Sequence, residues 1–195
     1  MSSLLALIGF SFVSSVTPGP NNVLLWASGA TFGFRRTIPH IVGTALGIGA
    51  MALGAAAGIA ALVTAFPPIG IAMKVAGSIY LVYLAIQIAR SGALQAGVVA
   101  HPLSLGAAAA FQLINPKAWI FAIGAVTTFR PVELPIVTGS LLVALTMMAV
   151  IVPSAALWAA GGGALGQLLS GERSRRIVSL ILAALVVATV ASVWV

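Results

Sequence analysis

The sequence predicts an all-α integral membrane protein with about six transmembrane helices. Of its 195 residues, 61% are hydrophobic and only 6% are charged, whereas soluble domains average about 25% charged residues. Because so few charges cannot cover a soluble fold, most of the surface is expected to face lipid. A crossing needs roughly 20 apolar residues, so about six crossings fill the chain. Residues 1–195 are therefore predicted to form a single transmembrane domain.

The formal net charge of +7 does not indicate a nucleic-acid partner. The basic residues stand singly or in short groups between apolar runs, as is typical of the loops of membrane proteins. Cysteine is absent, which excludes disulfides and thiolate metal sites. The opening apolar stretch is predicted to belong to the first span rather than to a signal peptide, because signal peptides begin with basic residues and the first one here is Arg35.

Six apolar stretches mark the predicted spans. The first and fourth are longer than one crossing requires, and each has a polar, proline-containing break near its middle, at Thr17 to Asn22 and at Asn115 to Lys117. A polar connector, residues 89–102, separates the third stretch from the fourth. The stretches cover residues 4–34, 38–64, 69–88, 103–129, 136–165 and 177–195.

The two breaks are predicted to face the protein interior. Proline inside a helix removes a hydrogen bond and clashes with the preceding turn, and in lipid the freed backbone groups need partners from protein or a wet cavity. Asn115 before Pro116, and Thr17 before Pro18, are typical of an N-cap and a first helical residue. A helix that restarts there presents unpaired N–H groups and a positive dipole end, which can bind an anion. A simple kink or an extracellular turn is the alternative.

The spacing of the breaks predicts a 3+3 inverted repeat with broken helices 1 and 4. Pro18 and Pro116 are 98 residues apart, so each half, approximately residues 1–97 and 98–195, holds a broken span followed by two ordinary ones. Three spans are an odd number, so the second half would be inverted, an architecture that recurs in transporters. Residue identity between the halves is poor, so this prediction rests on layout. Five spans plus a re-entrant segment remain the alternative.

Small residues repeat along the second stretch at steps of four, seven and four, which keeps them on one helix face. Such faces let helix backbones approach closely in lipid. We therefore expect helix packing, rather than substrate contact, at Gly43, Gly47, Gly54 and Gly58. The pair Gly162 and Gly166 in the fifth stretch is expected to act in the same way.

Three segments together resemble one transporter family. TPGPNN at Thr17 to Asn22 resembles the opening signature of the LysE/RhtB family of amino-acid exporters. MKVAGSIYLVYLAIQIARSG, from Met73 to Gly92, is similar to the third span of that family, and NPKAWIF, from Asn115 to Phe121, is similar to its second signature. The similarity covers most of the chain in the expected order.

The resemblance implies a secondary transporter that exports amino acids or related small metabolites across the bacterial inner membrane. It implies an ion gradient as the energy source, without ATP or a cofactor, and no Walker A loop is present in the sequence. Its partners would be the small-molecule substrate and the lipid bilayer, and a homodimer is compatible with it. The positions that match the signatures, and that are expected to bind substrate, are Pro18, Gly19, Pro20, Asn21, Asn22, Asn115, Pro116 and Lys117.

One feature departs from the family pattern. Some members have an acidic residue in the membrane region, but this chain has no Asp, and its only acids, Glu133 and Glu172, lie in predicted loops. An intramembrane carboxylate is the usual means of carrying a proton or binding a cation. We therefore expect no proton coupling through such a group, and a neutral amino acid as the substrate rather than lysine or arginine.

Three other functions compete with export of amino acids. A membrane-embedded enzyme or a metal-ion exporter would need a cluster of His, Asp, Glu or Cys, but His40 and His101 are isolated and are expected to be ordinary interfacial residues near span ends. Trp158 is likewise expected near a span end. A structural membrane subunit agrees with the composition but would not need two breaks. The sequence thus predicts no enzyme and no metal site, and leaves the exact substrate, the coupling ion and the oligomeric state open.

The basic residues also predict an orientation. The side that follows spans one, three and five is rich in arginine, whereas the opposite side holds Arg130, with Lys74 near the start of span three. Cytoplasmic loops carry the excess of Lys and Arg, so both termini are expected outside. The predicted cytoplasmic residues are Arg35, Arg36, Arg90, Arg173, Arg175 and Arg176.

Reporter fusions at the C-terminus test this orientation. A reporter that is active only outside the cytoplasm should be active there, because the arginine-rich side is expected to stay in the cytoplasm. A cytoplasm-only reporter should be silent at the same position. Activity of the cytoplasmic reporter would overturn the orientation.

Overall fold

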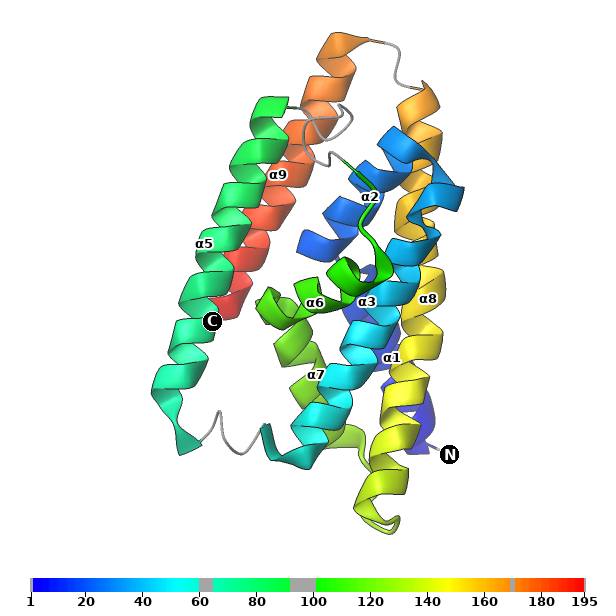
Figure 1. Cartoon of the computed structure of the whole chain (residues 1–195), viewed down its shortest axis with the longest axis vertical. Helices are drawn as coiled ribbons and strands as arrows, with labels where there is room; N and C mark the ends of the chain where they lie inside the picture. Colours follow the sequence, from blue (N-terminus) through cyan, green and yellow to red (C-terminus); the bar gives the residue numbers. More distant parts are fainter. Residues whose placement is uncertain (1, 60–64, 92–100, 169–170, 195) are drawn as a thin grey trace.

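The computed structural model describes residues 2–59, 65–91, 101–168 and 171–194. Every regular element in these ranges is a helix (Figure 1), which confirms the all-α prediction. Four helices are each long and apolar enough to cross a membrane. They are α3 (Phe34–Gly54), which continues into a short π-helix, η1 (Ala55–Ile59), then α5 (Pro67–Ser91), α8 (Ile136–Leu168) and α9 (Glu172–Trp194).

Two bent helix pairs supply two further crossings if each pair counts as one span. In the first, α1 (Ser2–Val16) meets α2 (Pro20–Phe32) at 61°. In the second, α6 (Leu105–Ile114) meets α7 (Pro116–Phe129) at 81°. Both bends fall at the predicted breaks, so the two broken helices are confirmed for the described residues, while the number of spans lies between four and six and the count of six stays a prediction.

The caps of the restarted helices differ in part from the prediction. Asn115 is the N-cap of α7 and Pro116 is its first residue, as expected. The N-cap of α2, however, is Gly19 with Pro20 at the first helical position, so the prediction of an N-cap at Thr17 is wrong. The hydroxyl of Thr17 instead donates to the carbonyl oxygen of Ser14, at 3.0 Å, in the last turn of α1.

The two halves of the chain run in opposite directions. In Figure 1 the α1–α2 pair rises from the end where the N-terminus lies, whereas α6 lies across the middle of the molecule and α7 descends from it toward that end. Helix α3 packs against α8 and α5 packs against α9, so corresponding spans of the halves pair with each other. An inverted repeat requires this order and direction. The repeat and its halves stay a prediction, and their boundary at 97/98 lies outside the described residues.

Glycines permit the closest helix crossings of the bundle. A Cβ at Gly43 would overlap the Leu105 carbonyl of α6, and one at Gly47 would lie 2.8 Å from the Ala109 carbonyl. Between α2 and α8, a Cβ at Gly162 would overlap the Trp26 carbonyl. These backbones approach so closely that no larger residue fits without displacing a helix.

Gly58 does not share the packing face predicted for it. It lies in η1 with a φ of 114°, a left-handed conformation that favours glycine. A Cβ added there would meet no atom within 4 Å. Gly58 therefore allows the backbone to turn at the end of this span, while Gly54 is half-buried at the end of α3.

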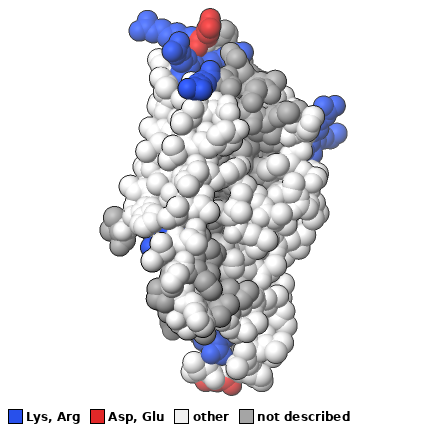
Figure 2. Space-filling model, turned by 60° about the vertical axis from the view of Figure 1, so that its left-hand side comes forward, with Lys and Arg blue, Asp and Glu red and all other residues white. Residues whose placement is uncertain are grey.

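The surface agrees with a lipid environment. Large apolar side chains point outward along the spans, for example Ile79, Leu145 and Leu157, which are 66%, 61% and 62% exposed. Figure 2 shows charged side chains mainly at the two ends of the molecule and a largely uncharged surface between them. The helix ends that carry the predicted cytoplasmic arginines lie together at one end (Figure 1).

A pair of variants in α3 tests the glycine packing. Gly47→Leu should lower the yield of folded protein strongly, because the new side chain meets the α6 backbone and overpacking costs about 1–3 kcal/mol. Leu46→Ala, at a neighbouring position that is 42% exposed, should change the yield little. Equal yields of the two variants after detergent extraction would contradict this account.

Candidate functional site

The two helix breaks are joined by hydrogen bonds of Lys117. Its ammonium group donates to the carbonyl oxygen of Thr17 at 2.7 Å, to the hydroxyl of Thr17 at 2.9 Å and to the carbonyl oxygen of Pro18 at 3.2 Å. Gly19 makes this approach feasible, because a Cβ there would lie 2.9 Å from Cδ of Lys117. The first turn of α7 thus reaches the carboxyl end of α1, where the helix dipole is negative and suits a cation.

Other side chains satisfy the remaining carbonyl oxygens at the end of α1. The amide nitrogen of Asn22 donates to the carbonyl oxygens of Ser15 and Thr17, both at 2.8 Å. The indole of Trp158 donates to the carbonyl oxygen of Val16 at 3.3 Å. Trp158 therefore lies beside the break in the interior of α8, and its predicted place near a span end is wrong.

The second break uses its polar residues differently. Asn115 has the extended backbone of an N-cap, but its side chain makes no cap hydrogen bond. The amide nitrogen of Asn115 instead donates to Oε1 of Gln112 at 3.3 Å. The indole of Trp119 donates to the carbonyl oxygen of Leu113 at 2.8 Å, which satisfies one of the carbonyl oxygens that α6 leaves free at its end.

Asn21 connects the first break to α3 and α6. Its Oδ1 accepts from Nε2 of Gln112 at 2.9 Å, from the hydroxyl of Thr44 at 3.1 Å and from Nε2 of His40 at 3.3 Å. All four residues are at least nine-tenths buried. One amide oxygen therefore holds three donors from two other helices, which fixes the start of α2 against both.

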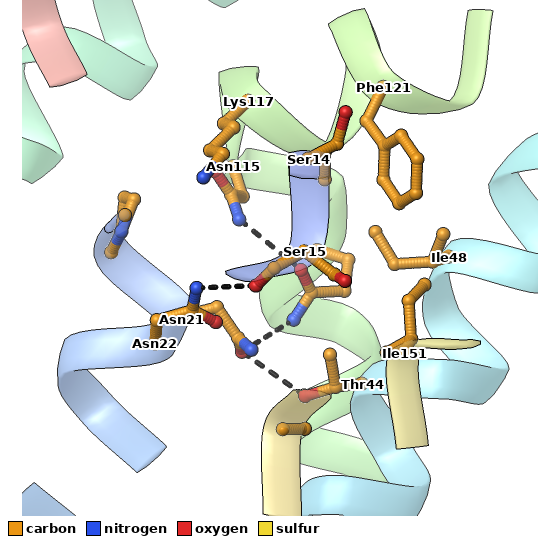
Figure 3. Close-up of a pocket in the computed structure, with 15 residues that line it drawn as sticks. Ser14, Ser15, Asn21, Asn22, Thr44, Ile48, Asn115, Lys117, Phe121 and Ile151 are labelled. Atoms are coloured by element: carbon orange, nitrogen blue, oxygen red, sulfur yellow. Dashed lines mark hydrogen bonds between the residues drawn. The ribbon is translucent and has the colours of Figure 1, made fainter. Parts of the chain in front are cut away.

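A partly open cavity of about 50 Å³ lies between the breaks. Its polar lining combines the restarted ends of α2 and α7 with side chains from α1, α3 and α6, and Figure 3 shows Asn21, Thr44, Asn115 and Lys117 around it. A larger hollow of about 550 Å³ among α2, α5 and α6 is lined mainly by apolar and aromatic residues. The polar cavity is lined by Ser14, Ser15, Gly19, Pro20, Asn21, Asn22, Thr44, Ile48, Gln112, Asn115, Lys117, Ala118, Phe121, Ile151 and Ala155.

Six of the eight predicted site residues line this cavity, and two do not. The side chain of Pro18 is exposed, although its carbonyl oxygen accepts from Lys117. Pro116 is buried against α5, where a Cβ at Gly77 would lie 2.8 Å from its Cδ. The structure thus gives these two prolines a place in the break itself, next to the cavity rather than in its wall.

Sequence reasoning missed the side chains that surround Asn21. His40 is fully buried and bonded to Asn21, so the interfacial position predicted for it is wrong, whereas His101 is exposed. His40 and Thr44 are four residues apart on one face of α3, and Gln112 is the one polar side chain within α6. The spacing of His40 and Thr44, and the single polar residue of α6, are the sequence features that could have indicated the polar contacts of Asn21. Within the described residues, no group of three His, Cys, Asp or Glu could hold a metal ion.

Two discontinuous helices that meet beside a cavity, inside a bundle of apolar helices, are an arrangement that recurs in secondary transporters. The family model of the LysE type translocator matches residues 12–193. The chain therefore belongs to the LysE type translocator family, which confirms the resemblance found in its signatures.

Named bacterial proteins are similar to part of this chain. Proteins of Escherichia coli and Shigella flexneri that are named cysteine/O-acetylserine efflux protein are each 33% identical to this chain over 121 residues. These alignments cover 62% of this chain and 62% of the length of each relative. No solved structure matches the chain at a significant level.

The adjacent asparagines of the first break give a matched test of the site. Asn22→Asp replaces a double donor by a carboxylate that faces two carbonyl oxygens, so it should destabilise the protein by about 1–3 kcal/mol or more. Asn21→Asp adds the same charge one residue away but keeps an acceptor for its three donors. We expect Asn22→Asp to melt at a lower temperature in detergent than Asn21→Asp. The reverse order of melting temperatures would show that Asn22 is not the donor, or Asn21 not the acceptor, in these hydrogen bonds.

Proposed function

We propose that this chain is a secondary transporter that exports neutral amino acids or closely related small metabolites across the bacterial inner membrane. Membership of the translocator family supports transport, and the names of its relatives support small, uncharged amino acids as cargo. We include in the proposal an ion gradient as the energy source and no catalytic activity or cofactor. The proposal is compatible with a monomer and with a homodimer.

The polar cavity between the breaks is the observation that carries this proposal. It is lined by the first residues of α2 and α7, whose N-terminal dipole ends favour a negative group. The amino group of Lys117 belongs to the same lining. A substrate carboxylate would therefore find a favourable position there, without any acidic residue nearby to oppose it.

The hydrogen bonds of Lys117 suggest how binding is linked to movement. Its ammonium group is bonded to oxygen atoms of Thr17 and Pro18. A carboxylate is a stronger acceptor for a cation than a carbonyl group, so a substrate can replace these partners. In the proposed function, that exchange releases the end of α1 from α7 and allows the break to change its conformation.

The charges around the cavity favour a neutral amino acid over a basic one. The two acids of the chain, Glu133 and Glu172, are exposed, Glu133 between α7 and α8 and Glu172 at the start of α9. A lysine or arginine side chain in the cavity would therefore lack a counter-charge, which is costly inside a membrane.

Two substitutions of Lys117 test this function in an efflux assay on an amino-acid panel. Lys117→Gln should weaken the apparent affinity for the exported amino acid by about tenfold to a hundredfold, because a charge-assisted hydrogen bond is lost. Lys117→Arg keeps the charge and should retain more of the activity. Both variants are compared with the unmodified protein at matched amounts of folded protein in the membrane.

Three results would count against the proposal. If the unmodified chain lowers the intracellular pool of no amino acid, the proposed substrate class is wrong. If Lys117→Gln exports with unchanged apparent affinity, Lys117 is not a carboxylate ligand. If the preferred substrate is lysine or arginine, the argument from the missing counter-charge fails.

A further inference from the structure

Backbone contacts fix the orientation of the amide groups beside the cavity. Nε2 of Gln112 donates to the carbonyl oxygen of Ala108 at 3.1 Å and to Oδ1 of Asn21 at 2.9 Å. A backbone carbonyl can only accept a hydrogen bond, so the nitrogen of Gln112 must face Ala108. Oε1 of Gln112 must then face the other way, toward Asn115.

This orientation in turn fixes the side chain of Asn115. Because Oε1 of Gln112 can only accept, the group of Asn115 that faces it at 3.3 Å must be the amide nitrogen. Oδ1 of Asn115 is then left over. It is buried, it has no hydrogen-bond partner, and the residue as a whole is only 4% exposed.

An acceptor without a partner is unusual in a protein interior and requires an explanation. Three other buried polar atoms among the described residues also lack partners, in Ser11, Trp26 and His40. Of the four residues, only Asn115 lines the cavity between the breaks. Its oxygen is therefore a buried acceptor without a partner, in a residue that lines the cavity.

We infer that Oδ1 of Asn115 accepts a hydrogen bond from the α-ammonium group of the substrate, an inference that rests on the proposed function. An amino acid carries both a carboxylate and an ammonium group, and both must be satisfied when it leaves water. Lys117 and the N-terminal ends of α2 and α7 serve the carboxylate. Since no acidic residue lines the cavity, a neutral oxygen must serve the ammonium group.

This arrangement accounts for selection by the α-amino group rather than by the side chain. Lys117 and Asn115 both lie at the start of α7, two residues apart, so one rigid segment presents a cation and a free acceptor together. A compound with the carboxylate but without the amino group would leave Oδ1 of Asn115 unsatisfied. Sites built to hydrogen-bond a substrate group reject analogues that lack it.

The test uses the purified full-length chain in lipid vesicles. Transport of L-cysteine is compared with transport of 3-mercaptopropanoate, which has the same carbon chain and thiol but no amino group. The unmodified protein should prefer cysteine. In Asn115→Leu, which has a similar volume and no acceptor, this preference should fall by about tenfold or more, with little change for 3-mercaptopropanoate. Asn115→Asp keeps the acceptor and should retain the preference for cysteine.

The other outcomes distinguish failure of this inference from failure of the proposed function. If Asn115→Leu lowers transport of both compounds equally, or changes neither, Asn115 does not contact the ammonium group although export stands. If the unmodified protein transports neither compound nor any other amino acid, the proposed function fails and this inference fails with it. If Asn115→Leu gives no folded protein, Asn115→Ala enters the same comparison with the same expected loss of preference.

Discussion

The structure depends on one constraint: backbone polar groups inside a lipid bilayer must find hydrogen-bond partners within the protein. Each helix break frees carbonyl oxygens on one side and N–H groups on the other. At the first break, Asn22, Trp158 and Lys117 together satisfy the carbonyl oxygens of residues 15–18. These three side chains come from three different helices. The break therefore depends on side chains that neighbouring helices bring to it.

The same constraint places a polar cavity in an apolar bundle. The carboxyl end of α1 is neutralised by Lys117, whereas the opposite sides of the breaks, the first turns of α2 and α7, line the cavity with their positive dipole ends. Asn21 then ties α2 to α3 and α6 through its single oxygen. In the proposed function, this arrangement offers a position for an anionic group without an acidic side chain in the lining of the cavity.

The spans and both breaks could be predicted from sequence because their causes are local. Proline at positions 18, 20 and 116 disfavours a continuous helix because it removes a backbone hydrogen bond, and apolar length marks a crossing. Yet Pro39 and Pro153 lie inside continuous helices, so proline alone does not determine where a span is broken. At the two breaks, polar residues beside the proline supply partners for the freed backbone groups.

The details of the site could not be predicted because its contacts join distant parts of the chain. Trp158 and Val16 are separated by 142 residues, and Gln112 and Asn21 by 91. Nothing in the local sequence of His40 indicates that it is buried against Asn21. Gly58 fits the spacing of the small-residue face, but its left-handed φ of 114° interrupts the helical geometry there, so the spacing no longer predicts its position on a helix face.

The central claim, that the two breaks meet, can be measured directly because the chain has no native cysteine. Asn21→Cys combined with Gln112→Cys should be joined within intact membranes by a short bifunctional thiol reagent. Asn21→Cys with Thr128→Cys should not, since Thr128 lies twelve residues along α7 from Pro116, about 18 Å by helix rise. Linkage of the first pair alone supports the account. No linkage of that pair, or equal linkage of both, would contradict it.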